Sequence, residues 1–233
     1  MGRIGLATIA LLLATVPGDK APAAEATDVP WVDLVYSPGF DEGCAFRVQE
    51  PLDPEAVTEL DAMMPRLQEA WRRDGPELLA AAREVVGEPF HFQKTTARLL
   101  TCGVASVSRP LAINVRPYLR ATAGGPPTAA SQFARTVFHE LLHRYVMEAM
   151  ARHGLRDTPL LRKYGSEPEV VRDHLHLFAI EEAVYRRTGR ARELEDVEAF
   201  EASLVKAALF ARGRQIVRAE GAQAFLDELR AYN

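Results

Sequence analysis

Short runs of β-branched and aromatic residues mark the first half of the chain. They fall at residues 31–37, 90–102 and 109–119, and Leu111, Ile113 and Val115 alternate with other residues in the last run. Because alternation places every second side chain on one face of a strand, these three segments predict strands. The stretch "PGFDEG", which follows the first of them, predicts a loop.

Helical spacing of apolar residues begins after this predicted loop. Asp53 as a cap and Pro54 at the first helical position open a predicted helix that Gly75 ends. Residues 76–86 predict a second, short helix that stops at Gly87. The first half of the chain is therefore expected to combine strands with helices.

The second half of the chain reads as helical throughout. Helices are expected at residues 131–152 and 167–187, with one or two more between 193 and 232, broken near Gly213 and Gly221. Strands first and helices second predict an α+β fold: a small N-terminal mixed or antiparallel sheet with helices, followed by a mainly helical C-terminal half.

The first two dozen residues differ from the rest. Arg3 precedes an uncharged apolar run over residues 4–16, and small residues follow around Ala23. This arrangement is typical of a secretory signal peptide, and the apolar run is shorter than the roughly 20 residues that span a bilayer. We expect a signal peptide at residues 1–24, a single domain at residues 25–233, export to the periplasm or the medium, and no stable membrane insertion after cleavage.

Composition and charge narrow the class of partner. Hydrophobic residues make up 48% and charged residues 26% of the chain, a balance that predicts a folded core rather than disorder. The formal net charge of −4 argues against a nucleic-acid partner, which a basic stripe would mark. Cys44 and Cys102 lack the close spacing of a redox or zinc motif, so in an exported protein they predict a structural disulfide.

The segment "TVFHELLHRYV", residues 136–146, carries the candidate chemistry. Residues four apart on an α-helix lie one above the other, so His139 and His143 can direct ring nitrogens at one metal ion. Glu140 projects about a hundred degrees away from His139, near enough to accept a proton without being a ligand. Histidines on an apolar helix also need partners, which favours metal binding over a chance pattern.

With the strand before it and the helix after it, this segment resembles the zincin metallopeptidases. The resemblance implies that His139 and His143 bind zinc and that Glu140 is the general base toward a zinc-bound water. It also implies that an edge strand upstream of the motif helix pairs with the substrate backbone. The stretch "LAINVRPYL", residues 111–119, is the candidate for that strand.

A catalytic zinc needs a third protein ligand. Val146 and Ala149 stand where the metzincin branch of the family has glycine and histidine, so that branch is excluded. In the gluzincin branch a glutamate from a separate downstream helix completes the site, and residues 167–187 are the predicted downstream helix here. Ser166 and Glu169 predict a capping box at its start.

A helical wheel ranks the candidates on this downstream helix. His174 and Glu181 project into its apolar face, whereas His176 projects to the opposite, more exposed side. His174 and Glu181 lie about 10 Å apart along the helix axis, so both cannot easily bind one ion. We expect His174 to be the third ligand, with Glu181 and His176 as alternatives; the residue left over can hold a ligand histidine by its other ring nitrogen.

Three protein ligands and one open position describe a catalytic zinc site. We therefore expect an exported zinc metallopeptidase that cleaves a peptide or protein substrate, with Glu140 as the base. The alternatives are a zincin-like protein that binds metal or a partner without catalysis, and a zinc hydrolase of a non-peptide amide. Candidates to stabilise the oxyanion are Tyr145, His153, Tyr164 and Tyr185.

Overall fold

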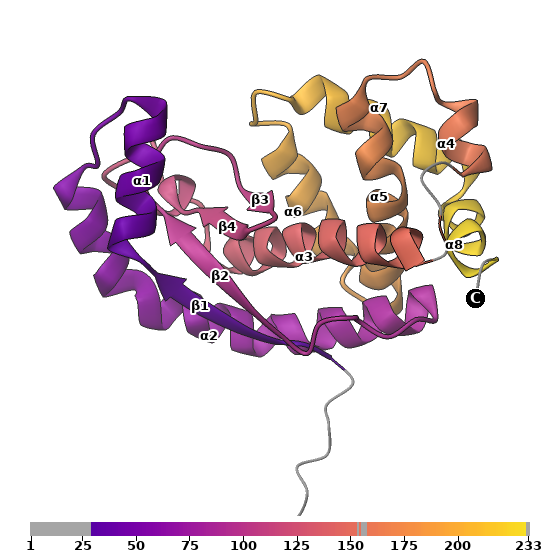
Figure 1. The fold of residues 1–233 in the computed structure, drawn as a ribbon, viewed down its shortest axis with the longest axis horizontal. Coiled ribbons are helices and arrows are strands. Elements are labelled where there is room, and N and C mark those ends of the chain that lie inside the picture. Colours follow the sequence, from indigo (N-terminus) through magenta and orange to yellow (C-terminus); the bar gives the residue numbers. More distant parts are fainter. Residues whose placement is uncertain (1–28, 153, 155–157, 232–233) are drawn as a thin grey trace, which may run out of the picture.

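The computed structural model describes residues 29–152, 154 and 158–231 (Figure 1). The first half of the chain forms β1 (Trp31–Tyr36), α1 (Pro38–Val48), α2 (Pro54–Val86), β2 (Lys94–Leu100), β3 (Val107–Ser108), β4 (Leu111–Asn114) and the short 3-10 helix η1 (Arg116–Tyr118). The second half forms α3 (Ala130–Arg152), α4 (Pro159–Lys163), α5 (Glu169–Arg187), α6 (Ala191–Glu201), α7 (Ala207–Glu220) and α8 (Ala222–Arg230). The predicted α+β class is confirmed, while the predicted signal peptide lies outside the described residues.

The four strands form one mixed sheet in the order β1-β2-β4-β3. β2 pairs in parallel with both β1 and β4, whereas β3 pairs with β4 antiparallel. Parallel neighbours need a long connection, and α1 and α2 supply it between β1 and β2. β4 therefore has neighbours on both sides, so the prediction that residues 111–119 form a substrate-pairing edge strand is wrong. On that side of the sheet the edge strand is β3.

Helix α2 is one continuous helix of 33 residues, where two helices were predicted. Pro65 and Pro76 lie inside it, and each deprives the residue four positions earlier of a helical hydrogen bond. Those residues, Asp61 and Arg72, are exposed like the prolines, so water can bond their carbonyl groups and the helix continues. Gly75, predicted to end a helix, is buried in the middle of α2.

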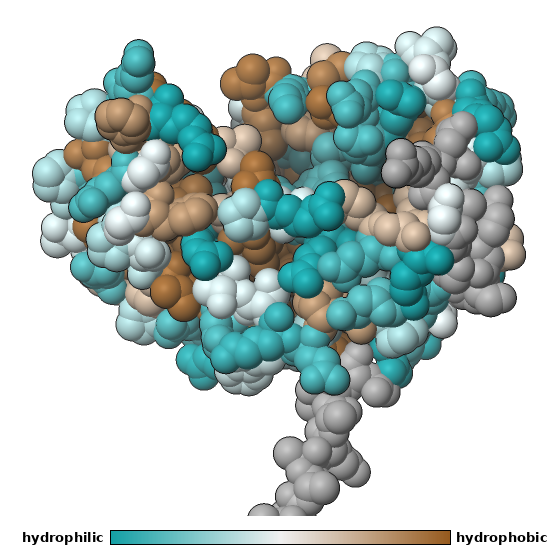
Figure 2. Space-filling view, viewed as in Figure 1, coloured by the Kyte–Doolittle hydropathy of each residue, from teal (hydrophilic) through white to brown (hydrophobic). Residues whose placement is uncertain are grey.

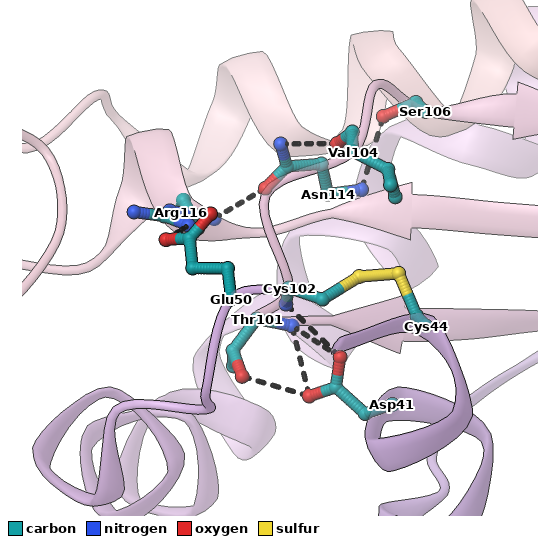
Figure 3. Close-up of a disulfide and its surroundings, with 9 residues drawn as sticks. All are labelled: Asp41, Cys44, Glu50, Thr101, Cys102, Val104, Ser106, Asn114 and Arg116. Carbon is teal, nitrogen blue, oxygen red and sulfur yellow. Dashed lines mark hydrogen bonds and ion pairs between the residues drawn. A yellow bond between two sulfur atoms is a disulfide. The ribbon is translucent and has the colours of Figure 1, made fainter. Parts of the chain in front are cut away.

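Residues 38–48 form helix α1, where the sequence predicts a loop in its first part. Glycine disfavours helix, so tertiary contacts hold this element. The buried Asp41 accepts hydrogen bonds from the Thr101 N–H, the Thr101 hydroxyl and the Cys102 N–H, at 2.7 to 3.1 Å. One turn later Cys44 forms the predicted disulfide with Cys102, which ties α1 to the end of β2 (Figure 3).

The boundaries of the later helices also differ from the prediction. Among the residues that the structure describes, three helices follow α5, and Gly221 separates the last two, but Gly213 lies inside α7. Helix α5 begins at Glu169, directly after Pro168. Within the described chain no side-chain hydrogen bond caps this end, so the capping box predicted with Ser166 is wrong.

Helix α5 lies at the centre of the helical half (Figure 1). It packs against α3, α7 and α8, while α2 contacts α3, α5 and α8 from the other side. The two helices that carry the candidate metal ligands, α3 and α5, are therefore held by the main core. In the part of the chain that the structure describes, no helix has both the length and the hydrophobicity to cross a membrane.

Candidate metal centre

Three histidine rings meet where α3 and α5 pack together. His139 and His143 lie one turn apart on α3, and His174 comes from the first half of α5. One ring nitrogen from each residue lies within 4.8 Å of the other two, and the Nε2 atoms of His143 and His174 are 3.2 Å apart. The packing of the two helices thus brings the motif histidines and the first-choice third ligand together.

The nitrogen separation fits a shared metal ion. Zinc bonds to histidine are about 2.0–2.1 Å long, so two nitrogens of a tetrahedral site lie about 3.3 Å apart. The 3.2 Å between His143 and His174 is close to this value. Three imidazoles without a cysteine also match the ligand set of a catalytic site with one open position, because a structural zinc takes four protein ligands.

The outer nitrogens of two rings are fixed by acceptors. His174 Nδ1 lies 2.6 Å from the Val170 carbonyl, which can only accept, so Nδ1 carries the hydrogen. His139 Nδ1 lies 3.0 Å from Oε1 of Glu181 and donates to that carboxylate in the same way. In the neutral rings each Nε2 therefore keeps its lone pair for a metal ion, an arrangement that metal-binding histidines commonly show.

Glu181 belongs to a buried network of charges behind His139. Nη2 of Arg214, on α7, donates to Oε2 of Glu181 at 2.7 Å. The same guanidinium forms two bonds of 2.7 Å to Glu201, on α6. Burial alone would raise the pKa of Glu181, but the charges of Arg214 and His139 outweigh it and lower the pKa to about 2. Glu181 is thus an anion that orients His139.

A second group of possible ligands overlaps the first. Oxygen or nitrogen atoms of His139, Glu181 and Glu201 also lie within 4.8 Å of one another. The guanidinium of Arg214 already bonds to both carboxylates. A metal cation there would meet this positive charge, so the three histidines are the better candidate and Glu181 is assigned to support His139.

Burial keeps two of the histidines neutral. Desolvation is the largest cause that lowers the pKa of His143 to about 2, and the charges of His139 and His174 add to it. Desolvation and the charge of His139 lower the pKa of His174 to about 3. Burial alone would lower the pKa of His139, but the charge and hydrogen bond of Glu181 outweigh burial, so the pKa is raised. Because metal binding requires unprotonated nitrogen, neutral rings are the form that a ligand must take.

Glu140 follows His139 on α3 and is 8% exposed. Among the described residues, its carboxylate has no hydrogen-bond partner. Burial raises its pKa, an effect that the charge of His139 opposes and that of Glu181 reinforces. A buried carboxylate with a raised pKa, one residue after His139 on α3, suits proton transfer, because a base works best when its pKa approaches the working pH.

His176 lies on the side of α5 that faces away from the three histidines, but it is not exposed. Its side chain is buried, and Nε2 lies 2.8 Å from Oε2 of Glu228. The ring meets that of Phe225 edge to face. The prediction of an exposed His176 is wrong because α8 covers this side of α5, which a wheel of one helix cannot reveal.

The oxyanion candidates are placed elsewhere or left undecided. The hydroxyl of Tyr145 donates to the Glu88 carbonyl, and that of Tyr164 bonds to Glu220. Tyr185 is fully buried, and its hydroxyl has no hydrogen-bond partner in the described part of the chain. His153 lies outside the described residues. The structure therefore brings neither Tyr145 nor Tyr164 to the three histidines.

Two aromatic rings that pack against His174 were not predicted from the sequence. The ring of Phe178 lies 5.2 Å from that of His174 and 4.2 Å from the guanidinium carbon of Arg214. A second ring, that of Phe210 on α7, lies 5.1 Å from His174. Both rings restrict where His174 can turn. The spacing of Phe178, four residues after His174, was a usable signal, since residues four apart share a helix face.

Replacing Gly213 with alanine should disturb the packing of the Phe178 ring. A Cβ at Gly213 would lie 2.8 Å from the ring of Phe178, so the ring or helix α7 must move. We expect Gly213→Ala to lower the free energy of unfolding by about 1–3 kcal/mol, measured by urea denaturation. Gly43→Ala is the matched control, because a Cβ there meets no atom within 4 Å in helix α1. A stability for Gly213→Ala equal to that of the control would contradict the close approach.

Comparison of the chain with models of protein families, with curated proteins and with solved structures finds no match. The three histidines and the buried Glu140 are therefore the features of the chain that indicate a function.

Proposed function

We propose that the protein is an exported zinc-dependent metallopeptidase. The observation that carries the proposal is the meeting of His139, His143 and His174, with their nitrogens within 4.8 Å, together with the buried carboxylate of Glu140, which follows His139 on α3. A site meant only to hold a metal has no need of that carboxylate. The Cys44–Cys102 disulfide supports export, since such bonds persist in oxidising compartments.

Each residue has a distinct part in this proposal. His139, His143 and His174 would hold the zinc ion, and Glu181 would keep His139 oriented through its Nδ1. When bound, zinc supplies a Lewis acid that polarises a carbonyl group and makes water a stronger nucleophile at neutral pH. Glu140 would accept a proton from the attacking water and then deliver it to the leaving amine.

Metal analysis of purified protein tests the ligand set. We expect stoichiometric zinc in the unaltered protein and its loss in His139→Ala, His143→Ala and His174→Ala, because each change removes one of three ligands. His176→Ala is the control, since that ring bonds to Glu228 on the other side of α5. Elemental analysis by mass spectrometry gives the zinc content. Zinc retained in His174→Ala, with loss in His139→Ala, would overturn the proposed third ligand.

A further inference from the structure

A groove of about 630 Å³ lies between the start of β2, the turn that joins β3 to β4, and the C-terminal half of α3. Four cations and one carboxylate line it, for a net charge of +3 in a chain whose net charge is −4. These charged residues are Lys94, Arg98, Arg109, Arg144 and Glu148. In Figure 2, hydrophilic residues cover the C-terminal half of α3 and the start of β2. The groove is thus a local positive region on an acidic protein.

Two of the four cations remain available to a ligand. Lys94 bonds to Asp33 at 2.8 Å, and Arg144 bonds to Glu148 at 2.7 Å. Within the described chain Arg98 and Arg109 have no carboxylate partner. Their guanidinium groups instead lie 5.2 Å from the ring of Phe40 and 2.8 Å from the sulfur of Met147, respectively. Two guanidinium groups without acids favour an anionic ligand with more than one carboxylate.

The groove also contains an open strand edge. Val115 donates its N–H to the Leu100 carbonyl, so Leu100 directs its backbone groups toward β4. Because successive residues of a strand face opposite edges, Lys94, Thr96 and Arg98 direct theirs the same way. Pairing with β4 begins only at Arg98. On this edge Lys94 and Thr96 have no strand partner among the described residues, so an extended peptide can bond to their backbone groups.

We propose that this groove binds an extended acidic peptide segment, whose backbone pairs with β2 at Lys94 and Thr96 and whose carboxylates bond to Arg98 and Arg109. Naming that segment as part of the substrate rests on the proposed function. The position of the groove supports the assignment of this segment to the substrate, because Arg109 contacts Met147, one turn after His143 on α3. A peptide is favoured over a nucleic acid because the open strand edge offers backbone hydrogen bonds and the chain as a whole is acidic.

Fluorescence anisotropy with labelled peptides tests the proposal in the Glu140→Gln protein, where proton transfer is blocked. The probes are short peptides of alternating Glu and Thr, or of alternating Gln and Thr. We expect the acidic peptide to bind more tightly, and Arg98→Gln combined with Arg109→Gln to weaken it about tenfold. Arg72→Gln is the control, because this arginine pairs with Glu69 on the exposed side of α2. An acidic peptide with methylated backbone nitrogens should also bind more weakly.

Equal binding of the two peptides, or binding unaffected by the double arginine change, would overturn the groove as an acidic-peptide site. Tighter binding of a single-stranded oligonucleotide than of the acidic peptide would overturn the choice of a peptide. Circular dichroism establishes that the double variant is folded, and the methylated peptide tests pairing without any change to the protein. Zinc content is measured on the same samples, so failure of peptide binding with zinc retained rejects the groove alone.

Discussion

Glu140→Gln should retain zinc and lose hydrolysis of an unfolded protein substrate, with kcat/KM lower by a factor of about 10²–10⁴. Glutamine has nearly the same shape as glutamate but cannot accept the proton of the attacking water. The three histidines are unchanged, and Glu140 does not belong to the group of possible metal ligands that they form. Release of peptide fragments, followed by chromatography, measures the rate, and elemental analysis of the same preparation measures the metal.

Glu195→Gln is the matched control for this result. It removes the same charge from an exposed position on α6, so it should leave both rate and metal content unchanged. Activity of Glu140→Gln equal to that of the control would remove the peptidase assignment. Retained zinc with no hydrolysis by the unaltered protein would favour the alternative of a metal-binding protein without catalysis.

Arg214→Met should destabilise the protein by about 3–5 kcal/mol. Methionine fills similar space but leaves two carboxylates, Glu181 and Glu201, in the interior without their shared cation. Both acids are less than 9% exposed, so water cannot take over the lost bonds. Urea denaturation of the metal-free protein gives the change in free energy of unfolding, and zinc competition with a chelator gives the change in metal affinity.

Arg218→Met provides the comparison on the same helix. Arg218 lies one turn after Arg214, is 54% exposed in its side chain and pairs with Glu198, so its replacement should cost about 0–1 kcal/mol. Arg214→Lys keeps the charge without the forked geometry and should lie between the two. A loss for Arg214→Met within about 1 kcal/mol of that for Arg218→Met would show that the buried network contributes little.

The ligand helices are the part of the site that local patterns can predict. His139 and His143 follow from spacing on one helix, and the wheel of residues 167–187 places His174 and Glu181 on one face. Both residues do face α3 in the structure. Arg214 is not predictable in this way, because it comes from a later helix and its partners are known only once α5, α6 and α7 pack together.

The errors in the fold share a physical cause. Local sequence identifies proline and glycine as breaks, but the surroundings decide whether a break occurs. Pro65 and Pro76 are tolerated in α2 because their unbonded carbonyl partners face solvent. Helix α1 forms despite its glycines because Asp41 and the disulfide attach it to the end of β2. Gly213 lies inside α7, where the ring of Phe178 occupies the space of a side chain, so this glycine serves close packing rather than a helix break.

The long helix α2 limits how this protein can be divided. All the candidate ligands lie after residue 130, yet α2 supplies buried residues such as Leu67, Trp71 and Leu78 to the same core as α3 and α5. A fragment that begins at α3 would expose the apolar faces of both ligand helices to water. The histidine site is therefore not a module that can be excised or transplanted, and a minimal functional unit must include the N-terminal half.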